Sequence, residues 1–514
     1  MISVSDAWKD VQQRFLLPES HIEIDVGVTD DDAQRVATVS GTSEAVFSNA
    51  ESVTTVSDVV KYATNELNLW ALDGTMSILP SSGDYGNAGY VSNIESTGGF
   101  TLSFPAVRVS AISGITITWG NNYGEYPKVF TVLGKRGDTV IAETTVTDNN
   151  SSVSGVSISL ENYDGISVVV HEWGLPHRRV RIEKIVIGHI MTFTKKDLLS
   201  FTHEQDGDLL SGKLPKYSIE FSLDNSDGRW DPNNPTGMAQ YLSERQKLTV
   251  RYGLDVNGTI EWIPGGVFYL SEWVAPPNGI EARFVARDMF EFLLDEEMWS
   301  SSMSSMSSLY SWITYYATTN KLPKGASVVV DEALQTLSAE YSPSYSDGTV
   351  STNAEIIQKC ANAGGCIIRC DRADVLYVEK FDSTDTGYRI PLSLSYSYPE
   401  MTLSKPLKEV AVDYGADSPY KLSVDTTGVQ QTLSNDFIGT SANAATVAEW
   451  VRDVLKTRKT VSGEFRADPR LDVYDVVTVE DRYGKALKVV ITNIKYVFNG
   501  SFRGSFTGRI LEVS

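Results

Sequence analysis

Residues 222–237 read SLDNSDGRWDPNNPTG and separate two strand-like stretches, YSIEF at 217–221 and KLTVRY at 247–252. The stretch holds three Asp, three Asn, two Pro and two Gly. Asx side chains close local turns and Pro with Gly interrupts regular structure, so it predicts a structured loop between strands. A calcium loop is the alternative. With Gly228 at the sixth position of an EF-hand, Leu223 and Asn234 occupy the first and last ligand positions, which disfavours calcium.

The composition indicates a β-rich protein of several domains. The chain has 514 residues, 41% of them hydrophobic and 10% aromatic, enough for roughly three or four cores. A net charge of −22 opposes binding to nucleic-acid phosphates, which needs clustered Lys and Arg. The N-terminus MISVSDAWKDVQQRF lacks the apolar segment of a secretion signal. The sequence contains no run of about 18 apolar residues, so no transmembrane helix is predicted.

The sequence contains few of the residue patterns that catalysis or metal binding requires. Cys360, Cys366 and Cys370 lack CxxC spacing and a sequence-near His, so neither zinc nor a disulfide framework is predicted. The chain has five His and contains neither GxSxG nor HExxH. His171, Glu172 and His177 imitate a metal cluster, but strand alternation favours surface positions for them. We therefore expect no enzyme activity and no metal or cofactor.

Alternating strands separated by Gly, Asn and Asp turns fill residues 70–190 and predict a self-contained β-sandwich. Further strands over 195–300 predict a small barrel. Residues 308–390 predict an α+β domain, with a helix in TNAEIIQKCANAGG that ends at Gly364–Gly365 and a hairpin around DRAD. Beyond residue 400 strands return, with a helix predicted over 441–457 and Ser441 as its N-cap.

Two segments near the C-terminus carry a family resemblance. FRADPRLDVYDVVTVED (465–481) and ITNIKYVFNGSFRGSFTGRI (491–510) resemble the closing barrel of bacteriophage tail baseplate hub proteins. That family has an Asn/Asp-Pro-x-Leu turn followed by a GDxV corner. Asp468, Pro469, Leu471 and Asp475 match, whereas Tyr474 stands where the family usually has Gly.

The resemblance extends over about 195–514, since EFSLDNSDGRWDPNN, KLTVRYG and GGVFYLSEW resemble the first hub barrel. AEIIQKCANAGGCIIRCDRADVLYVEKF resembles the domain between the barrels, and YDGISVVVHEWGLPHRRVRIEKIVIG resembles inserted jelly-roll carbohydrate-binding modules. The resemblance to hub proteins implies a mainly β fold with a minor α+β part. This fold is built from two small hub barrels, an α+β domain between them and an inserted sandwich. The implied domains are an N-terminal segment of the first hub domain (1–69), the inserted module (70–190), the first hub barrel (191–299), the α+β hub domain (300–395) and the second hub barrel with a helix (396–514).

The resemblance also implies a structural role in the virion of a long-tailed phage, a prophage or a tailocin, after synthesis in the bacterial cytoplasm. Three chains would form a homotrimeric ring in which six similar barrels surround a channel. The implied partners are a distal tail protein, the tail tube, a tape-measure protein and tail fibres or receptor-binding proteins. DNA would pass through without specific binding, and an acidic channel would repel it.

Host-glycan binding by the inserted module is a further hypothesis. Sugar recognition uses an aromatic platform with planar polar groups, and the candidate residues are Trp119, Asn121, Asn122, Tyr123, Tyr126 and Trp173. The alternative for Trp119 is packing in the sandwich core. Three other functions stay open: a glycan-binding adhesin, a hexameric distal tail protein and a cell-wall hydrolase.

Overall fold

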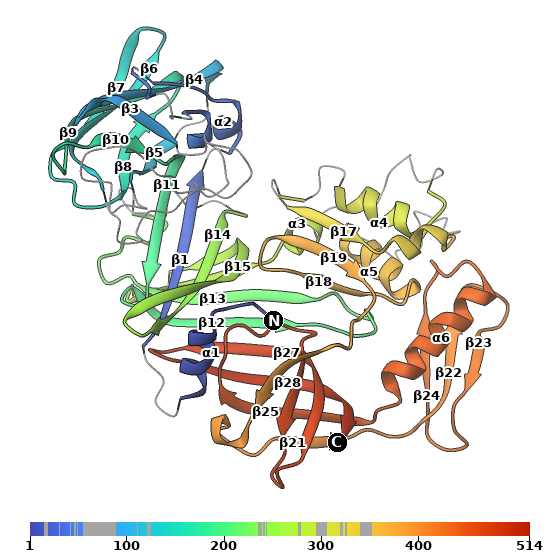
Figure 1. Ribbon diagram of the computed structural model, residues 1–514. Helices are drawn as coiled ribbons and strands as arrows, with labels where there is room; N and C mark the ends of the chain where they lie inside the picture. Colours follow the sequence, from blue (N-terminus) through green and yellow to red (C-terminus); the bar gives the residue numbers. More distant parts are fainter. Residues whose placement is uncertain are drawn as a thin grey trace. The chain divides into compact units, whose positions relative to one another are not determined.

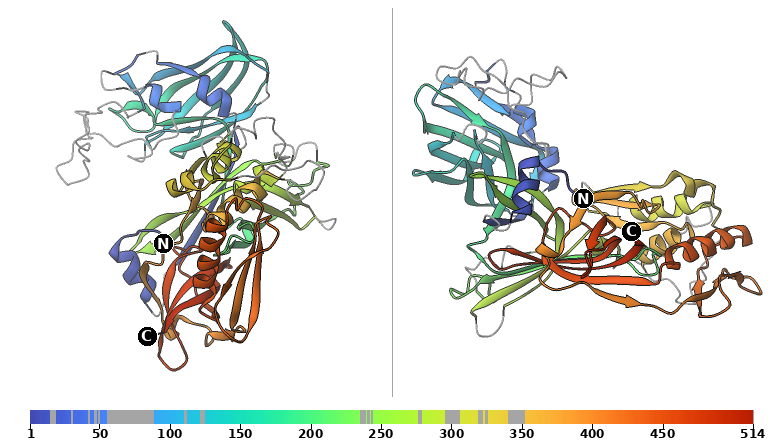
Figure 2. Two further views of the ribbon diagram at one scale, coloured as in Figure 1. Left: turned by 90° about the vertical axis from the view of Figure 1, so that its right-hand side faces the viewer. Right: turned by 60° about the horizontal axis from the view of Figure 1, so that its bottom comes forward.

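The computed structural model describes residues 1–14, 19–29, 31–41, 43–45, 48, 50–54, 89–109, 112–120, 125–234, 239, 242, 244–275, 279–294, 306–318, 322–323, 326–339 and 352–513. They form two compact units, drawn in Figure 1 and from two further sides in Figure 2. Unit 1 comprises Met1–Asp25 and Thr192–Ser514, and unit 2 comprises Val26–Met191. The chain enters unit 2 within strand β1 (Ser20–Thr29) and leaves it within β11 (Lys184–Thr194).

Unit 2 is a sandwich whose strands alternate between a buried and an exposed face. In β8 (Val153–Leu160) every second residue is buried, as expected for a strand with one face on a core. One sheet has the order β2-β4-β9-β6-β7, and β11-β5-β8 follow one another in a second. The remaining elements are α2 (Asp31–Val36), β2 (Thr38–Gly41), η1 (Ala50–Thr54), β3 (Tyr90–Glu95), β4 (Gly98–Arg108), β5 (Ile112–Thr118), β6 (Pro127–Arg136), β7 (Thr139–Val146), β9 (Tyr163–Trp173) and β10 (Arg179–Ile182).

The start of unit 2 differs from the sequence-based boundary. Strand β2 pairs with β4, with Val39 opposite Leu102, so residues before 70 belong to the sandwich. Residue 70 itself lies outside the described residues. The polar 29–68 segment gave no periodic signal because β2 is only four residues long.

Unit 1 contains two sets of strands. The first set is β12 (Leu198–Asp206), β13 (Lys216–Asp224), β14 (Lys247–Val256), β15 (Thr259–Val274) and β16 (Glu281–Arg287). The second is β20 (Asp385–Ile390), β21 (Glu400–Leu403), β25 (Lys459–Arg466), β26 (Val476–Glu480), β27 (Ala486–Phe498) and β28 (Phe502–Val513). The mainly β fold class is thus confirmed, and the two sets are hydrogen-bonded to each other through β12 and β27, which lie side by side in Figure 1.

The two sets repeat one arrangement. In chain order and in pairing, β12, β13, β14, β15 and β16 correspond to β21, β25, β26, β27 and β28. The bulges also correspond: the register of β15 with β16 shifts between Leu270 and Glu272, and that of β27 with β28 shifts between Ile491 and Asn493. The second set carries an insertion between its first two strands, formed by β22 (Leu407–Asp413), β23 (Tyr420–Ser423), β24 (Val429–Ser434) and α6 (Ser441–Leu455).

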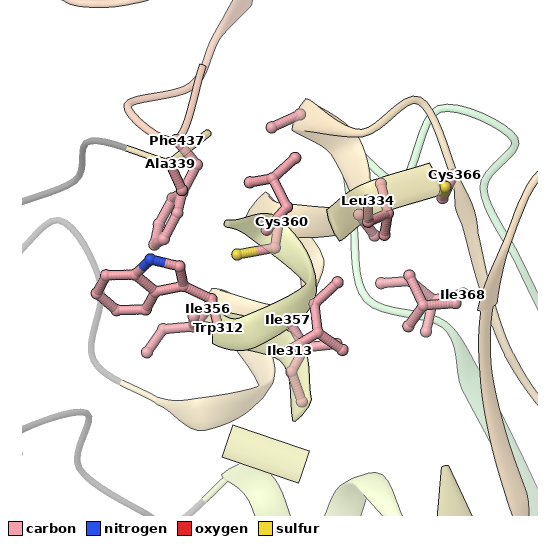
Figure 3. Packing of buried hydrophobic residues seen from close by; sticks show 14 of the residues in the cluster. Trp312, Ile313, Leu334, Ala339, Ile356, Ile357, Cys360, Cys366, Ile368 and Phe437 are labelled. Atoms are coloured by element: carbon pink, nitrogen blue, oxygen red, sulfur yellow. The ribbon is translucent and has the colours of Figure 1, made fainter. Parts of the chain in front are cut away.

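That insertion shares one core with the predicted α+β domain. Figure 1 shows α6 lying along β22, β23 and β24, and Figure 3 shows the ring of Phe437 against that of Trp312. Their centroids are 5.2 Å apart. The other elements of this part are α3 (Phe290–Leu294), α4 (Leu309–Thr318), β17 (Ser327–Val330), η5 (Glu332–Thr336), α5 (Asn353–Ala363), β18 (Ile367–Cys370), β19 (Val375–Glu379) and η6 (Leu392–Leu394).

Local sequence signals located the ends of α5 and α6 to within about two residues. α5 begins with a Thr352–Glu355 capping box and ends at Gly364, as predicted from its two glycines. α6 is capped by Thr440, whose side chain accepts a hydrogen bond from the Asn443 N–H, and not by Ser441. The N-terminal helix α1 (Asp6–Gln13) is capped by Ser5.

The loop 222–234 is organised by Asx side chains, as predicted. Asn225 Oδ1 accepts from the Trp230 N–H at 2.8 Å, and Asp227 Oδ1 accepts from Arg229 N–H at 3.0 Å. Asp224 and Asp231 bond the N–H groups of residues two further along the chain. These carboxylates therefore stabilise their own backbone turns.

Candidate functional site

The two strand sets of unit 1 meet along an antiparallel ladder. Phe201 of β12 lies opposite Phe498 of β27, His203 opposite Tyr496, and Asp206 opposite Asn493. Backbone pairing of this kind fixes the two sets as one rigid surface. This ladder and the side chains beneath it form the candidate site, which we call the junction.

An ion pair between the buried Arg372 and the partly exposed Asp472 ties three parts of unit 1 together at the junction. Arg372, in the DRAD turn between β18 and β19, donates from Nε and Nη2 to Asp472 Oδ1 at 2.9 and 2.8 Å. Its Nη1 donates to the carbonyl of Pro264 in β15, at 2.7 Å, and Nη2 also to the carbonyl of Leu471. One guanidinium thus bonds the first strand set and the turn between β25 and β26 of the second.

Burial and charge at the junction hold each group in one protonation state. Burial raises the pKa of Asp472, but the Arg372 guanidinium and the amide of Gln205 outweigh this and bring the pKa below its ordinary value. Burial, followed by the nearby Arg372 charge, lowers the pKa of His203 to about 3. The neutral imidazole bonds the Tyr252 hydroxyl through Nδ1 at 2.7 Å. We conclude that His203 is a neutral core histidine.

Tyr474 occupies a corner whose backbone conformation favours glycine. Tyr474 has a φ of 73°, in the left-handed region that favours Gly. Its N–H bonds the Ile491 carbonyl, and the Ile491 N–H bonds the Asp475 carbonyl. The Tyr hydroxyl accepts from the Asp208 N–H at 3.0 Å and donates to the Ile368 carbonyl at 3.2 Å. These bonds compensate for the strain of a bulky residue here.

The same corner occurs in the first strand set. Arg245 has a φ of 60°, its N–H bonds the Leu270 carbonyl, and the Leu270 N–H bonds the Gln246 carbonyl. Arg245 is therefore equivalent to Tyr474, and Leu270 to Ile491. Both corners thus have the same backbone conformation, and each carries a non-glycine side chain.

A half-open cavity of about 520 Å³ borders the junction. Tyr217, Cys370, Glu379, Asp472 and Tyr474 are among its lining residues. Burial raises the pKa of the Cys370 thiol well above its ordinary value, so the thiolate needed for nucleophilic attack is disfavoured. Within the described ranges, no group of three His, Cys, Asp or Glu side chains is arranged to hold a metal ion. The geometry suits a structural joint.

Of the predicted sugar-binding residues, the two Trp are buried, Tyr126 is half-buried, and the other three lie outside the described residues. Trp119 is 0% exposed and Trp173 is 4% exposed, with their rings 6.2 Å apart in the core of unit 2. Trp119 Nε1 donates to Ser154 Oγ at 2.8 Å. Tyr126 is half-buried, and Asn121, Asn122 and Tyr123 lie outside the described residues. The two indoles therefore offer no stacking surface here, and sugar binding stays a prediction.

The three residues that imitate a metal cluster have other partners. His171 Nε2 bonds the Thr131 hydroxyl at 2.9 Å, and His177 Nδ1 pairs with Glu95 at 3.0 Å. Glu172 is exposed and lies 3.6 Å from the Lys128 ammonium.

Sequence reasoning missed Arg372, His203 and Gln205, because nothing in a single sequence shows which polar side chains become buried together. Asp472 and Tyr474 lay inside the quoted motif, but the motif gave no partner for either residue. The one available signal was the DRAD turn, since a charged hairpin turn places Arg372 at the end of two apolar strands.

Comparison with known proteins gives matches of fold only. No family model and no curated protein matches the sequence. Among solved structures, the chain is similar to the 43 kDa tail protein of prophage MuSo2 from Shewanella oneidensis, at 14% identity, over 62% of this chain and 95% of that one, with a TM-score of 0.43. It is similar to a tail protein from Neisseria meningitidis at 13% identity, over 63% and 93%, with a TM-score of 0.41.

A third similarity covers a smaller part. Chitosan-binding module 1 of a chitosanase/glucanase from Paenibacillus matches 30% of this chain and 95% of that one, at 10% identity and a TM-score of 0.19. All three TM-scores lie below 0.5, and nothing about function follows from them. The neighbours are tail proteins and a carbohydrate-binding module, the classes that the sequence resembles.

Proposed function

We propose that this chain is a structural hub subunit of a phage-type tail tip or baseplate, and that three copies form a ring around a channel. The observation that carries the proposal is the internal repeat of unit 1. Five strands recur in the same order with the same pairing and equivalent bulges. A chain with two similar halves can present a nearly sixfold surface from three copies, which suits a hexameric tube above it.

The rest of the chain is consistent with a structural role. The junction is closed by paired polar groups and holds no activated nucleophile in the described residues. The described residues contain no helix long and apolar enough to cross a membrane. The net charge of −22 would let DNA pass along an acidic channel without being held. The distal tail protein, tube, tape measure and fibres would be its partners in a virion.

The mass of the purified chain in solution tests the ring. One chain has a mass of 56.5 kDa, so multi-angle light scattering across a concentration series should approach about 170 kDa, the mass of a trimer. Particles with six similar lobes around a hole should appear by electron microscopy. A hexamer would replace the hub by a distal tail protein. A monomer that stays monomeric up to the highest soluble concentration, without rings, contradicts the proposal.

Host-glycan binding by unit 2 is the finer, second proposal, and Tyr126 is the described residue that supports it. Tyr126 is half-buried beside the buried Glu125, which accepts from Trp173 Nε1 at 3.3 Å. Recognition would therefore depend on Tyr126 and the adjoining 121–124 segment. Binding to a glycan array that is abolished by Tyr126→Ala, with the unfolding midpoint retained, would support it. An array without signal contradicts it.

A further inference from the structure

The equivalent edge strands of the two sets, β12 and β21, differ in whether another strand of the chain pairs with them. In the first set, the edge strand β12 is covered by the second half of β27, where its ladder runs from Asn493 to Phe498. In the second set, the equivalent edge strand β21 pairs with β25 and ends the sheet of unit 1 among the described residues. The repeat therefore has two equivalent junctions, one of them formed inside the chain.

Exposure at equivalent positions shows the difference. His203 and Gln205 of β12 are 1% and 5% exposed. Counting along the ladders with β13 and β25, Met401 and Leu403 occupy the corresponding positions of β21. They are 47% and 60% exposed. Two large apolar side chains on an unpaired edge strand form a surface that soluble monomers normally avoid.

The complementary half of the open junction lies on β15. β27 pairs with β26 up to Val490 and then with β12. Its equivalent β15 pairs with β14 up to Tyr269, and its last residues, Ser271–Val274, have no strand beside them on that side in the described part of the chain. Val274 is 43% exposed. The indole N–H of Trp273 is buried without an acceptor in the described residues.

We propose that β21 of one copy pairs antiparallel with residues 271–274 of β15 in the next copy, repeating between chains the β12–β27 junction. This inference rests on the proposed ring and names the surface that closes it. The occupant of the β21 edge is a second copy, because the chain itself supplies both halves of the repeated junction. The contact is head-to-tail, and a head-to-tail contact closes into a ring when the rotation between copies is a whole fraction of a turn, which is one third for a trimer.

The internal junction also sets the register. Gln205 lies opposite Ile494 and Glu204 opposite Lys495. The bulge equivalence makes Trp273 correspond to Ile494 and Val274 to Lys495. Leu403 therefore faces Trp273 of the next copy, and Thr402 faces Val274. The apolar pair would bury both side chains, and the exposed Glu272 and Lys405 add opposite charges at the same end.

Backbone pairing at this edge has a defined limit. Pro399 precedes β21 and has no N–H, so it cannot extend the ladder as a donor. The pairing is confined to residues from Glu400 onward. Tyr396 and Tyr398, which are 50% and 65% exposed, lie beyond it and carry Arg503 and Arg482 over their rings. Tyr and Arg are the side chains most enriched at the energetic centres of interfaces.

A disulfide between copies tests the register. In the full chain, Thr402→Cys combined with Val274→Cys should give a cross-linked trimer on a non-reducing gel after mild oxidation. Thr402→Cys with Ile260→Cys is the matched control, because Ile260 is 39% exposed on the other end of the same strand. The wild type should remain uncross-linked, because Cys360 and Cys366 are buried and the pKa of the partly exposed Cys370 thiol is raised by burial, which disfavours its thiolate. A cross-link in the control pair alone contradicts the register.

A mass measurement separates this inference from the proposed function. Leu403→Asp should raise the concentration at half-dissociation of the trimer at least tenfold, whereas Val140→Asp, at a 45% exposed position in unit 2, should leave it unchanged. Suppose that the particle has the trimer mass of about 170 kDa, is unaffected by Leu403→Asp, and does not cross-link through Thr402→Cys with Val274→Cys. This result overturns the proposed interface but is compatible with the proposed hub. A chain that stays monomeric without a cross-link overturns both.

Discussion

Replacing Arg372 should reveal how much the junction contributes to the stability of unit 1. In Arg372→Met, Asp472, whose side chain is 27% exposed, loses both charged hydrogen bonds, of 2.8 and 2.9 Å. The carbonyls of Pro264 and Leu471 also lose their donor. Removing one partner of a fully buried pair costs about 3–5 kcal/mol, but Asp472 is partly exposed and keeps its bond from Gln205 Nε2, so the cost here should be smaller, about 2–3 kcal/mol. We expect a loss of that size in the free energy of unfolding at pH 7.

The same variant should change the dependence of stability on pH. In the wild type the folded pKa of Asp472 is depressed, so its contribution is present above the unfolded value of about 4 and is lost as the pH falls. Without Arg372, burial dominates and the folded pKa rises above the unfolded one. The variant then loses stability as the pH rises through the folded pKa. The difference between variant and wild type should therefore shrink from pH 7 to pH 4.5.

Urea unfolding at fixed protein concentration measures both effects. Arg283→Met is the matched control, because its pair with Glu220 is half-exposed and should contribute about 0–1 kcal/mol. The double variant Arg372→Met with Asp472→Asn should recover part of the loss, since it removes the uncompensated charge. A loss for Arg372→Met no larger than that of the control, with no change between the two pH values, would refute the assignment of Arg372 and Asp472 as the joint.

Three further predictions concern single positions. Gly207→Ala should cost about 1–3 kcal/mol, because its Cβ would lie 2.6 Å from both the Tyr474 hydroxyl and Val473 Cγ1, and Tyr474→Gly should relieve only the Tyr474 part of that clash in the double variant; urea midpoints of the four chains measure the coupling. Burial raises the pKa of Asp288 to about 7, so its contribution to stability is present below the unfolded pKa of about 4 and is lost as the pH rises to 7, and Asp288→Asn should abolish this slope between about pH 4 and 7. Trp119→Ala should lower the stability of unit 2 by about 3–5 kcal/mol, measured as a fall in the unfolding temperature, whereas a purely sugar-binding Trp119 would leave it unchanged.

Local features were readable from sequence where one short stretch contains both partners. The Asx loop at 222–234 and the Thr352–Glu355 cap close within a few residues, so residue type and spacing determine them. The sequence did not predict strand β2, and it placed the cap of α6 one residue too late. β2 depends on β4 far along the chain, and Thr440 and Ser441 are equally good cap residues by type.

The burial of the aromatic candidates could not be decided from sequence. Trp119 ends an alternating strand and adjoins a turn-rich segment, so core and surface positions both fit its context. Its distant partners decide the outcome: the ring lies 4.8 Å from that of Phe130, and the indole N–H reaches Ser154 on β8. Only the pairing of sheets brings these residues together.

The repeat of unit 1 shows why the proposed assembly would depend on strand edges that a sequence cannot identify. β12 and β21 are equivalent strands, yet β12 reads LLSFTHEQD and β21 reads EMTL. His203 and Gln205 are polar because the junction beneath them supplies Tyr252, Asp472 and a backbone N–H as partners. Met401 and Leu403 are apolar and exposed, with no strand beside β21 on that side among the described residues, and in our proposal a second copy buries them against Trp273 and its neighbours. The chemistry of the two edges differs because one partner is internal and the other, in our proposal, is another molecule.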